Sequence, residues 1–443
     1  MAGLATAAAA AAVAVPASAS ASAATSPVTG HVYVDDNTAG HNTIGAFDRH
    51  ADGTLTPETG SPFAAGGAGT GAGLASQGAL QITPDGRFLL AADAGNNQVS
   101  VLRIQPDGSL RPVPGGAVSS GGILPVSIAV HGDPVYVANA GTGGSNYTGF
   151  RLSDNGHLQP IPGSTVTLPD GSQPGDVLFN GDGSKLAGTR IGTSLIDSFT
   201  VGATGLLTPA PRSPLPAQGV GPFGSEFRPA NTGQLFVSNA HNGTGAGTVS
   251  AFRDSANGTL TSIAGSPFAD SQTAPCWVEI THDGQFLFTV NTASGSISRY
   301  SIAPGGALTL LGSTPVKGTS TGAVDARLSP DGQFLYVDEA SAGAVAAFAV
   351  QGGNLTELAS SPFSLPAGAA PATASSSPSQ PAQTRSRGRS PPAPPATTGC
   401  AGRAGLADRH PLMGPADPGT ATPLMTSGSN SGAIRKAARS SRL

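Results

Sequence analysis

A unit of about 50 residues is repeated along most of the chain. Its clearest copy, residues 328–358, contains a Ser-Pro-Asp-Gly turn, an aromatic and β-branched strand, a second alternating strand and a Gly-Gly-Asn turn that leads into a short third strand. These turn residues favour tight reversals, so each copy is expected to form an antiparallel β-meander. A Gly-x-Leu pair marks the third turn seven times, with successive leucines 47 to 55 residues apart, at Leu55, Leu110, Leu158, Leu207, Leu260, Leu308 and Leu355.

Seven strand-built repeats of this length predict an all-β fold, a seven-bladed β-propeller. No window shows the 3.6-residue apolar period of a helix, which excludes a helical solenoid. Blades two to seven are each expected to begin with an innermost strand, at 79–83, 126–130, 176–180, 224–228, 277–281 and 325–329.

The first blade begins with a middle strand at His31. Its innermost strand therefore has to come from the other end of the chain. No good candidate follows Ala372, where Pro-, Ser- and Arg-rich segments without periodicity begin. We expect a propeller domain at 31–372 that lacks its closing strand and is weakest at the seam between blades one and seven. A disordered tail at 373–443 is expected to follow it.

Charge is distributed unevenly between these two parts. Up to residue 372 the chain has 24 acidic residues against 13 Lys and Arg, whereas the tail has 2 acidic and 9 basic residues. The acidic propeller would repel a phosphate backbone, so we expect it to bind no nucleic acid.

A leader of small and apolar residues precedes the repeats. Ala5 to Val15 form an apolar run, and Ala-Ser-Ala follows at 17–19 and again at 21–23, which is typical of a signal-peptide cleavage site. The alternative is an Ala/Ser-rich linker, because the basic residues that usually begin a signal peptide are missing. We expect residues 1–30 to be this signal peptide or leader and the protein to be secreted. No other apolar run approaches the roughly 18 residues that span a bilayer, so no membrane span is expected.

The two cysteines lie in unlike contexts. Cys276 enters a predicted strand, whereas Cys400 lies in the tail. This predicts no structural disulfide, with Cys276 acting as a small buried apolar residue. No spacing of Cys and His suggests metal ligands, and neither a metal nor a cofactor is expected.

Polar residues recur at two positions of the repeat. The innermost strands place one set toward the central channel, namely Asp176, Glu226, Glu279, Asp325 and Arg327. The alternative is that these groups pair with one another or with backbone donors between blades. A second set follows the next strand, where a ligand-binding mouth would form: Asp93, Asn139, Asn239, Asn291 and Glu339, together with Arg190. Asn and Asp also cap turns, which explains their recurrence without any ligand.

The repeat resembles the lactonase family of seven-bladed propellers, which is named for 6-phosphogluconolactonase and includes carboxymuconate-cyclase-like enzymes. The resemblance covers roughly residues 31–372. It is carried by Ile-Thr-Pro-Asp-Gly-Arg-Phe-Leu at 82–89, Ser-Pro-Asp-Gly-Gln-Phe-Leu-Tyr-Val at 329–337, the Gly-x-Leu turns and the Ser-Pro-Phe segments that begin at Ser61, Ser266 and Ser361. Val-Tyr-Val-Ala-Asn at 135–139 is also similar to the YVTN-type repeat of surface propellers.

The resemblance implies catalytic positions that this chain does not keep. In catalytic relatives an Arg-His pair follows a Gly-Pro at the start of an inner strand, and a Glu follows the Asn of the next strand. Here Phe223, Gly224 and Ala240 stand at those positions, and a further family His aligns near Gln173. His241, with Glu226 or Glu279 and Arg190, is the candidate set for a rearranged site.

Two functions follow from this comparison. The favoured one is a secreted, non-catalytic propeller, expected to be a monomer, that binds a small molecule or an extracellular protein at its central mouth. The alternative is a lactone hydrolase, similar to 6-phosphogluconolactonase, with a rearranged active site.

Overall fold

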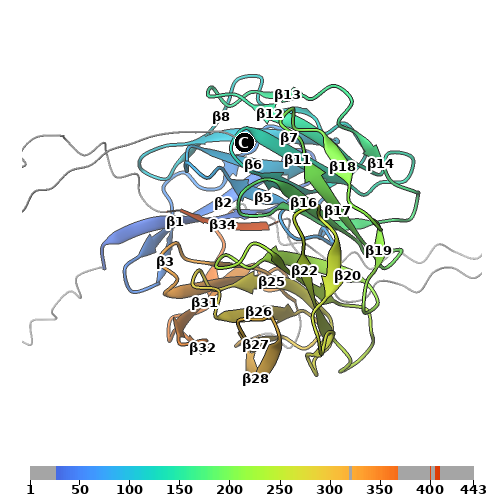
Figure 1. Cartoon of the computed structure of the whole chain (residues 1–443). Coiled ribbons are helices and arrows are strands. Elements are labelled where there is room, and N and C mark those ends of the chain that lie inside the picture. Colours follow the sequence, from blue (N-terminus) through green and yellow to red (C-terminus); the bar gives the residue numbers. More distant parts are fainter. Residues whose placement is uncertain (1–25, 319–321, 368–399, 401–404, 410–443) are drawn as a thin grey trace, which may run out of the picture. The chain divides into compact units, whose positions relative to one another are not determined.

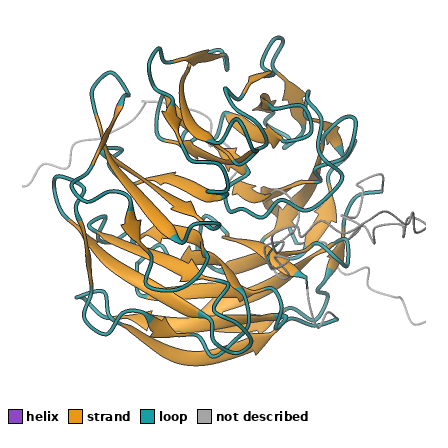
Figure 2. Cartoon of the chain, turned by 90° about the vertical axis from the view of Figure 1, so that its right-hand side faces the viewer, coloured by secondary structure: helices purple, strands orange, loops and turns teal. Residues whose placement is uncertain are grey.

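The computed structural model describes residues 26–318, 322–367, 400 and 405–409 of the chain. Its described residues form seven antiparallel sheets and no helix, so none of them forms a helix that could cross a bilayer (Figures 1 and 2). The innermost strands contact one another in the order β34, β5, β10, β15, β20, β25, β29 and back to β34. This closed order confirms the predicted seven-bladed propeller.

Each blade runs outward from its innermost strand. Blade one contains β34 (Gly405–Arg409), β1 (Val28–Asp35), β2 (Thr43–His50), β3 (Leu55–Pro57) and β4 (Phe63–Ala64). Blade two contains β5 (Leu80–Ile82), β6 (Phe88–Asp93), β7 (Gln98–Ile104), β8 (Leu110–Pro112) and β9 (Val118–Ser119). Blade three contains β10 (Pro125–Val130), β11 (Pro134–Asn139), β12 (Asn146–Leu152), β13 (Leu158–Pro160) and β14 (Val166–Thr167).

The other four blades repeat this order. Blade four contains β15 (Pro174–Phe179), β16 (Lys185–Arg190), β17 (Leu195–Val201), β18 (Leu207–Pro209) and β19 (Leu215–Pro216). Blade five contains β20 (Pro222–Phe227), β21 (Gln234–Asn239), β22 (Thr248–Asp254), β23 (Leu260–Ser262) and β24 (Phe268–Ala269). Blade six contains β25 (Pro275–Ile280), β26 (Phe286–Asn291), β27 (Ser296–Ile302) and β28 (Leu308–Pro315). Blade seven contains β29 (Ala323–Leu328), β30 (Phe334–Glu339), β31 (Ala344–Gln351), β32 (Asn354–Glu357) and β33 (Phe363–Ser364).

The sequence motifs have defined roles in these blades. In the Ser-Pro-Phe segments the serine hydroxyl accepts a hydrogen bond from a backbone N–H of the third strand, as Ser266 Oγ does from Ala251 N at 2.7 Å. The glycine of each Gly-x-Leu turn adopts a positive φ, which is +87° at Gly108. Its carbonyl can accept a hydrogen bond from the preceding blade, as Gly108 O does from Tyr33 Oη at 2.8 Å. The repeat therefore encodes contacts between blades as well as the strands themselves.

The ring has a closing strand, which corrects the expectation that it was missing. β34 comes from the segment predicted to be a disordered tail, and it pairs antiparallel with β1 on the inner side of blade one (Figure 1). The Leu406 N–H donates to Asp325 Oδ2 of blade seven at 3.0 Å. Arg49 Nε lies 2.9 Å from Asp408 Oδ2, and both side chains are almost completely buried. The Leu406 hydrogen bond thus bridges the seam between blades seven and one, and the buried ion pair holds β34 within blade one, while most of 373–443 lies outside the described residues.

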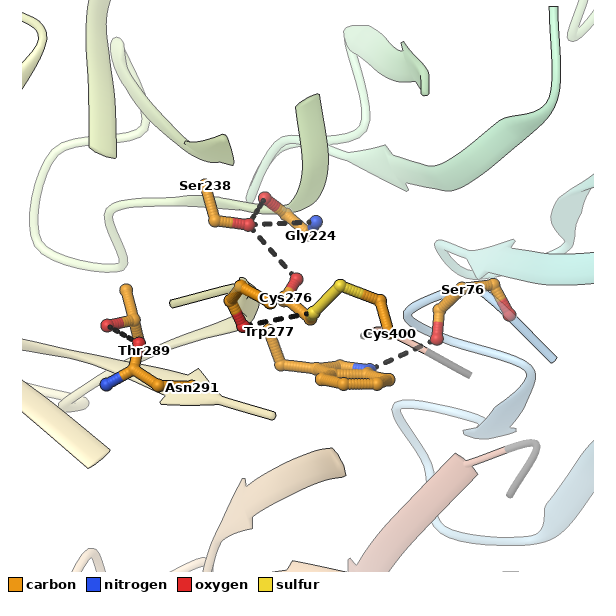
Figure 3. The surroundings of a disulfide bond; sticks show 9 residues. Ser76, Gly224, Ser238, Cys276, Trp277, Thr289, Asn291 and Cys400 are labelled. Carbon is orange, nitrogen blue, oxygen red and sulfur yellow. Dashed lines mark hydrogen bonds between the residues drawn. A yellow bond between two sulfur atoms is a disulfide. The ribbon is translucent and has the colours of Figure 1, made fainter. Parts of the chain in front are cut away.

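A disulfide joins Cys276 to Cys400, so the expectation of no structural disulfide is wrong. Cys276 lies at the start of β25 in blade six, and Cys400 lies five residues before β34 (Figure 3). The bridge therefore fastens the lead-in to the closing strand onto a different blade. The two residues are 124 positions apart, so the pairing could not be predicted from the local sequence around either cysteine.

Candidate functional site

A cavity of about 360 Å³ opens at the end of the ring where the innermost strands begin, which we call the mouth. Most of its wall is apolar and comes from Leu74, Leu124, Val126, Pro174, Ile191 and Phe223. The polar contributors are Thr70, Gln173 and His241. No Asp, Glu, Lys or Arg lines it among the described residues. The mouth cavity therefore suits a small, mainly apolar molecule with a few hydrogen-bonding groups.

The chain between β4 and β5 crosses the mouth and forms one side of this cavity. At its end, Gln77 Nε2 donates to Ser225 O at 3.0 Å and to Val278 O at 3.3 Å. Gln77 Oε1 accepts from the Val278 N–H at 3.0 Å. A residue that leads into blade two is thereby bonded to blades five and six. Gln77 is 4% exposed, and it lines a second cavity whose lining residues differ from those of the mouth cavity.

The disulfide and the single tryptophan form another side of the site (Figure 3). Cys400 lines the cavity, and Trp277 Nε1 donates to Ser76 O at 3.1 Å. The ring of Trp277 meets Phe223 edge to face, with centroids 5.2 Å apart. Because Phe223 lines the cavity, Trp277 lies one residue away from any molecule bound there.

The candidate catalytic residues do not converge. His241 lines the mouth cavity, where burial lowers the pKa of its imidazole and keeps the ring neutral at pH 7. Arg190 is held inside blade four, where its Nε and Nη2 donate to the two carboxylate oxygens of Asp197 at 2.6 and 2.5 Å. Glu226 and Glu279 are absent from the cavity wall. Among the described residues, no carboxylate or cation therefore lies beside the imidazole in the cavity.

Several polar residues of the innermost strands form contacts with neighbouring blades. Arg327 Nη1 donates to Glu279 Oε2 at 3.0 Å. Asp176 accepts hydrogen bonds from the Ser225 N–H and hydroxyl at 2.9 and 2.7 Å. Burial raises the pKa of Asp176 to about 7, and it raises the pKa of Asp325 to about 6. These contacts fit the interpretation in which the set links neighbouring blades.

Glu226 differs from the other polar residues of the innermost strands, because one of its carboxyl oxygens has no partner among the described residues. It lies with Asp176 and Arg327 along a second cavity of about 230 Å³, which shares no lining residue with the mouth cavity. Burial, and then the charge of Glu279, raise the pKa of the Glu226 carboxyl well above its ordinary value. Glu226 Oε2 has no hydrogen-bond partner among the described residues.

The second polar set is buried inside the blades rather than exposed at the mouth. Asp93, Asn139, Asn239, Asn291 and Glu339 are each 0% exposed. Asn139 Nδ2 donates to Asn146 Oδ1 at 2.8 Å, and Asn239 Nδ2 donates to Ser250 Oγ at 2.8 Å. None of the five lines the mouth cavity. Their geometry fits the alternative in which these residues join adjacent strands and turns.

Comparison with known proteins identifies the family. A family model described as "Lactonase, 7-bladed beta-propeller" matches residues 40–179 and 227–371, which is more than half of the chain. The chain belongs to the lactonase family. No curated protein matches it in sequence.

Solved structures agree with the fold of this lactonase-family propeller. A putative 6-phosphogluconolactonase from Bacteroides uniformis is 20% identical with a TM-score of 0.60, and the match covers 75% of this chain and 96% of that one. A periplasmic gluconolactonase from Pseudomonas aeruginosa is 19% identical with a TM-score of 0.60, covering 76% and 98% of the two chains. At such identities the likeness establishes the shared fold, and activity has to be judged from the site.

The implied catalytic positions of the family are filled differently in this chain. Phe223 lies where the resemblance implies an arginine, and Ala240 is 4% exposed where it implies a glutamate. At Gly224, where it implies a histidine, an added Cβ would lie 2.1 Å from Gln77 Oε1 and 2.7 Å from Cys276 O. The Gln77 side chain therefore occupies the space that a histidine at 224 would need.

Sequence reasoning missed the residues that close the site. Gln77, the chain at 70–75 and Cys400 were not candidates. The sequence contained one indication of the crossing segment. The interval from Leu55 to Leu110, which contains it, is the longest of the six between Gly-x-Leu leucines. An insertion in a propeller repeat commonly falls in a loop on one face, which is where this segment lies.

Proposed function

We propose that this lactonase-family propeller binds a small, mainly apolar molecule in the mouth cavity and does not open lactones by the family mechanism. The observation that carries the proposal is the contact at Gly224, where Gln77 leaves no room for the implied histidine. Lactone opening requires a group that activates water and a cation or donor set that stabilises the developing negative charge. The cavity offers one neutral imidazole and no cation among its described residues.

The chemistry of the wall defines the class of ligand. A volume of about 360 Å³ lies at the lower end of the roughly 300–1,000 Å³ range of small-molecule sites. The apolar wall favours a hydrocarbon part, and Gln173, Thr70 and His241 provide hydrogen bonds for an ester, carbonyl or hydroxyl group. A phosphorylated or carboxylated ligand would be buried without a counter-ion, which is unfavourable. An aliphatic lactone such as γ-decalactone matches this description and serves as a probe.

The binding test uses Trp277, the single tryptophan of the chain, as the reporter. We expect γ-decalactone to change its emission in a saturable manner. Ala140→Phe adds a ring to the cavity wall and should abolish the saturable change, because the added volume occupies the binding space. Ala51→Phe adds the same ring at an exposed turn and should leave the titration unchanged. No saturable change with the wild-type protein, or an unchanged titration with Ala140→Phe, would contradict the proposal.

The second candidate is a hydrolase with a rearranged site, and its support is the position of His241 in the cavity. A neutral imidazole can act as a general base. Under this alternative γ-decalactone would be hydrolysed faster than in buffer, and His241→Ala would remove the activity.

We also propose that the protein is secreted. The apolar leader supports this, and so does the disulfide, because disulfides form and persist mainly in oxidising compartments. N-terminal sequencing of protein recovered outside the producing cell should find a start after Ala19 or Ala23. An intact leader on protein retained in the cytosol would exclude this proposal.

A further inference from the structure

One contact between neighbouring blades is repeated around the ring. In three blades the first residue of the second strand packs against the glycine of the Gly-x-Leu turn in the following blade. Phe88, Phe286 and Phe334 do this, and a Cβ added at the facing glycine would come within 2.2 to 2.6 Å of their rings. In blade one the same place is taken by His31, whose ring lies 2.1 Å from a Cβ added at Gly108. A histidine in blade one thus takes the place of the phenylalanine found in blades two, six and seven, whereas Pro134, Lys185 and Gln234 begin the second strand in blades three to five.

A second apolar position of the same contact is also replaced in blade one. In blades two to five the residue that follows the short fourth strand is buried and apolar. These residues are Val113, Ile161, Ala210 and Ile263. In blade one it is Glu58, which is only 8% exposed. In blade two a Cβ at Gly156 would meet both Phe88 and Val113, which shows that the two positions are adjacent. The fold itself therefore requires no polar group at either place.

A third polar residue, Asp48, faces His31 across the β1–β2 ladder. His31 Nδ1 lies 3.1 Å from Asp48 Oδ1 and 3.8 Å from Glu58 Oε2. The three ligand atoms all lie within 4.8 Å of one another. Ligands about 2.1 Å from a tetrahedral Zn²⁺ ion are about 3.4 Å apart, so the two shorter distances bracket the expected spacing.

One atom of this cluster, the Nδ1 of His31, lacks a well-formed hydrogen bond among the described residues. His31 is 4% exposed, and its Nδ1 makes no hydrogen bond of acceptable geometry among the described residues although Asp48 lies close. Asp48 and Glu58 place two carboxylates beside the same imidazole. Imidazole nitrogen and carboxylate oxygen are both ligands that Zn²⁺ uses in proteins.

We propose that His31, Asp48 and Glu58 bind a divalent transition-metal ion of the Zn²⁺ type, with water completing the coordination. The imidazole nitrogen favours such an ion over Mg²⁺ or Ca²⁺, which prefer oxygen ligands. The Asp48 side chain is 27% exposed and gives the ion access from solvent.

The charges around the cluster are compatible with a dication. Arg409 pairs with His31 across β34 and β1, and its charge opposes a positive imidazole. Its Nη1 donates to Gln105 O at 3.2 Å. Asp107, at the adjacent turn, adds a nearby negative charge. Asp48, Glu58 and Asp107 supply three carboxyl groups against the one guanidinium, and a bound dication would favour the ionised form of Glu58.

The internal repeat supplies a variant that should remove the site without disturbing the fold. His31→Phe combined with Glu58→Val reproduces the Phe88 and Val113 pair of blade two. Tag-free, full-length protein is first depleted of metal and then titrated with Zn²⁺ in competition with a chromogenic chelator. We expect one equivalent to bind to the wild type and the affinity to fall by about 100-fold or more in the double variant. His131→Phe, which changes a histidine of blade three, should keep the full affinity.

A thermal scan distinguishes loss of the site from loss of the fold. Zn²⁺ should raise the unfolding temperature of the wild type and of His131→Phe, and leave that of the double variant unchanged. Without metal, the unfolding temperature of the double variant should be at least as high as that of the wild type, because the variant restores the apolar contact. The proposal is overturned if the wild type binds no Zn²⁺ at tens of micromolar, if only Ca²⁺ or Mg²⁺ binds, or if the double variant retains its equivalent.

Discussion

Asp408→Ala is expected to destabilise the propeller by about 3–5 kcal/mol, the usual effect of removing one partner of a buried ion pair. Its partner Arg49 is 0% exposed and would be left as an unpaired buried charge. The same variant weakens β34, the strand that closes blade one. Urea unfolding followed by Trp277 fluorescence and by circular dichroism measures the loss.

An exposed ion pair provides the matched control for this variant. Asp133 pairs with Arg151 on the surface of blade three, and both side chains are about half exposed. Asp133→Ala should therefore change the free energy of unfolding by less than about 1 kcal/mol. If Asp408→Ala also stays within 1 kcal/mol of the wild type, the strand at Gly405–Arg409 does not pack into the ring in solution.

Removal of the disulfide is expected to lower the free energy of unfolding strongly. Cys276 and Cys400 are 124 residues apart, and chain-entropy arguments assign about 5 kcal/mol to a loop of this length. The double variant Cys276→Ala, Cys400→Ala should lose about this amount, chiefly because its unfolded state gains freedom. Unfolding of the wild type in reductant should show the same loss.

The double cysteine variant and the reductant should act through the same bond, and combining them tests this. Reductant should have no effect on the double variant, which has no cysteine left. A double variant as stable as the oxidised wild type would mean that the bridge does not restrain the closing strand.

The blades could be predicted from the sequence because each one is local. The expected innermost strand at 126–130 corresponds to β10 at Pro125–Val130, since turn residues and alternating apolar residues fix its limits. The closing strand has no such signals. Gly405–Arg409 is a five-residue segment among Pro- and Arg-rich sequence, and its pairing depends on Arg49, Asp325 and the bridge to blade six. Contacts of that kind cannot be found in a local pattern.

The candidate site could be predicted only in part for the same reason. His241 follows a strand in the repeat, and its place at the mouth follows from that position. Gln77 could not be recognised, because its role depends on acceptors and donors in two blades about 150 and 200 residues further along the chain. The buried Asn and Asp side chains show the opposite case, in which a conspicuous repeated signal comes from the turns of the fold.

The central claim is that the mouth of this ring binds its ligand without opening a lactone. The most direct measurement follows γ-decalactone by NMR in the sample whose Trp277 emission reports binding, with protein and lactone at equal concentration. We predict saturable binding and a lactone that is hydrolysed no faster than in buffer over many hours. Ring-opened hydroxy acid that forms faster with the wild type, and at the buffer rate with His241→Ala, would contradict the claim and establish the rearranged hydrolase instead.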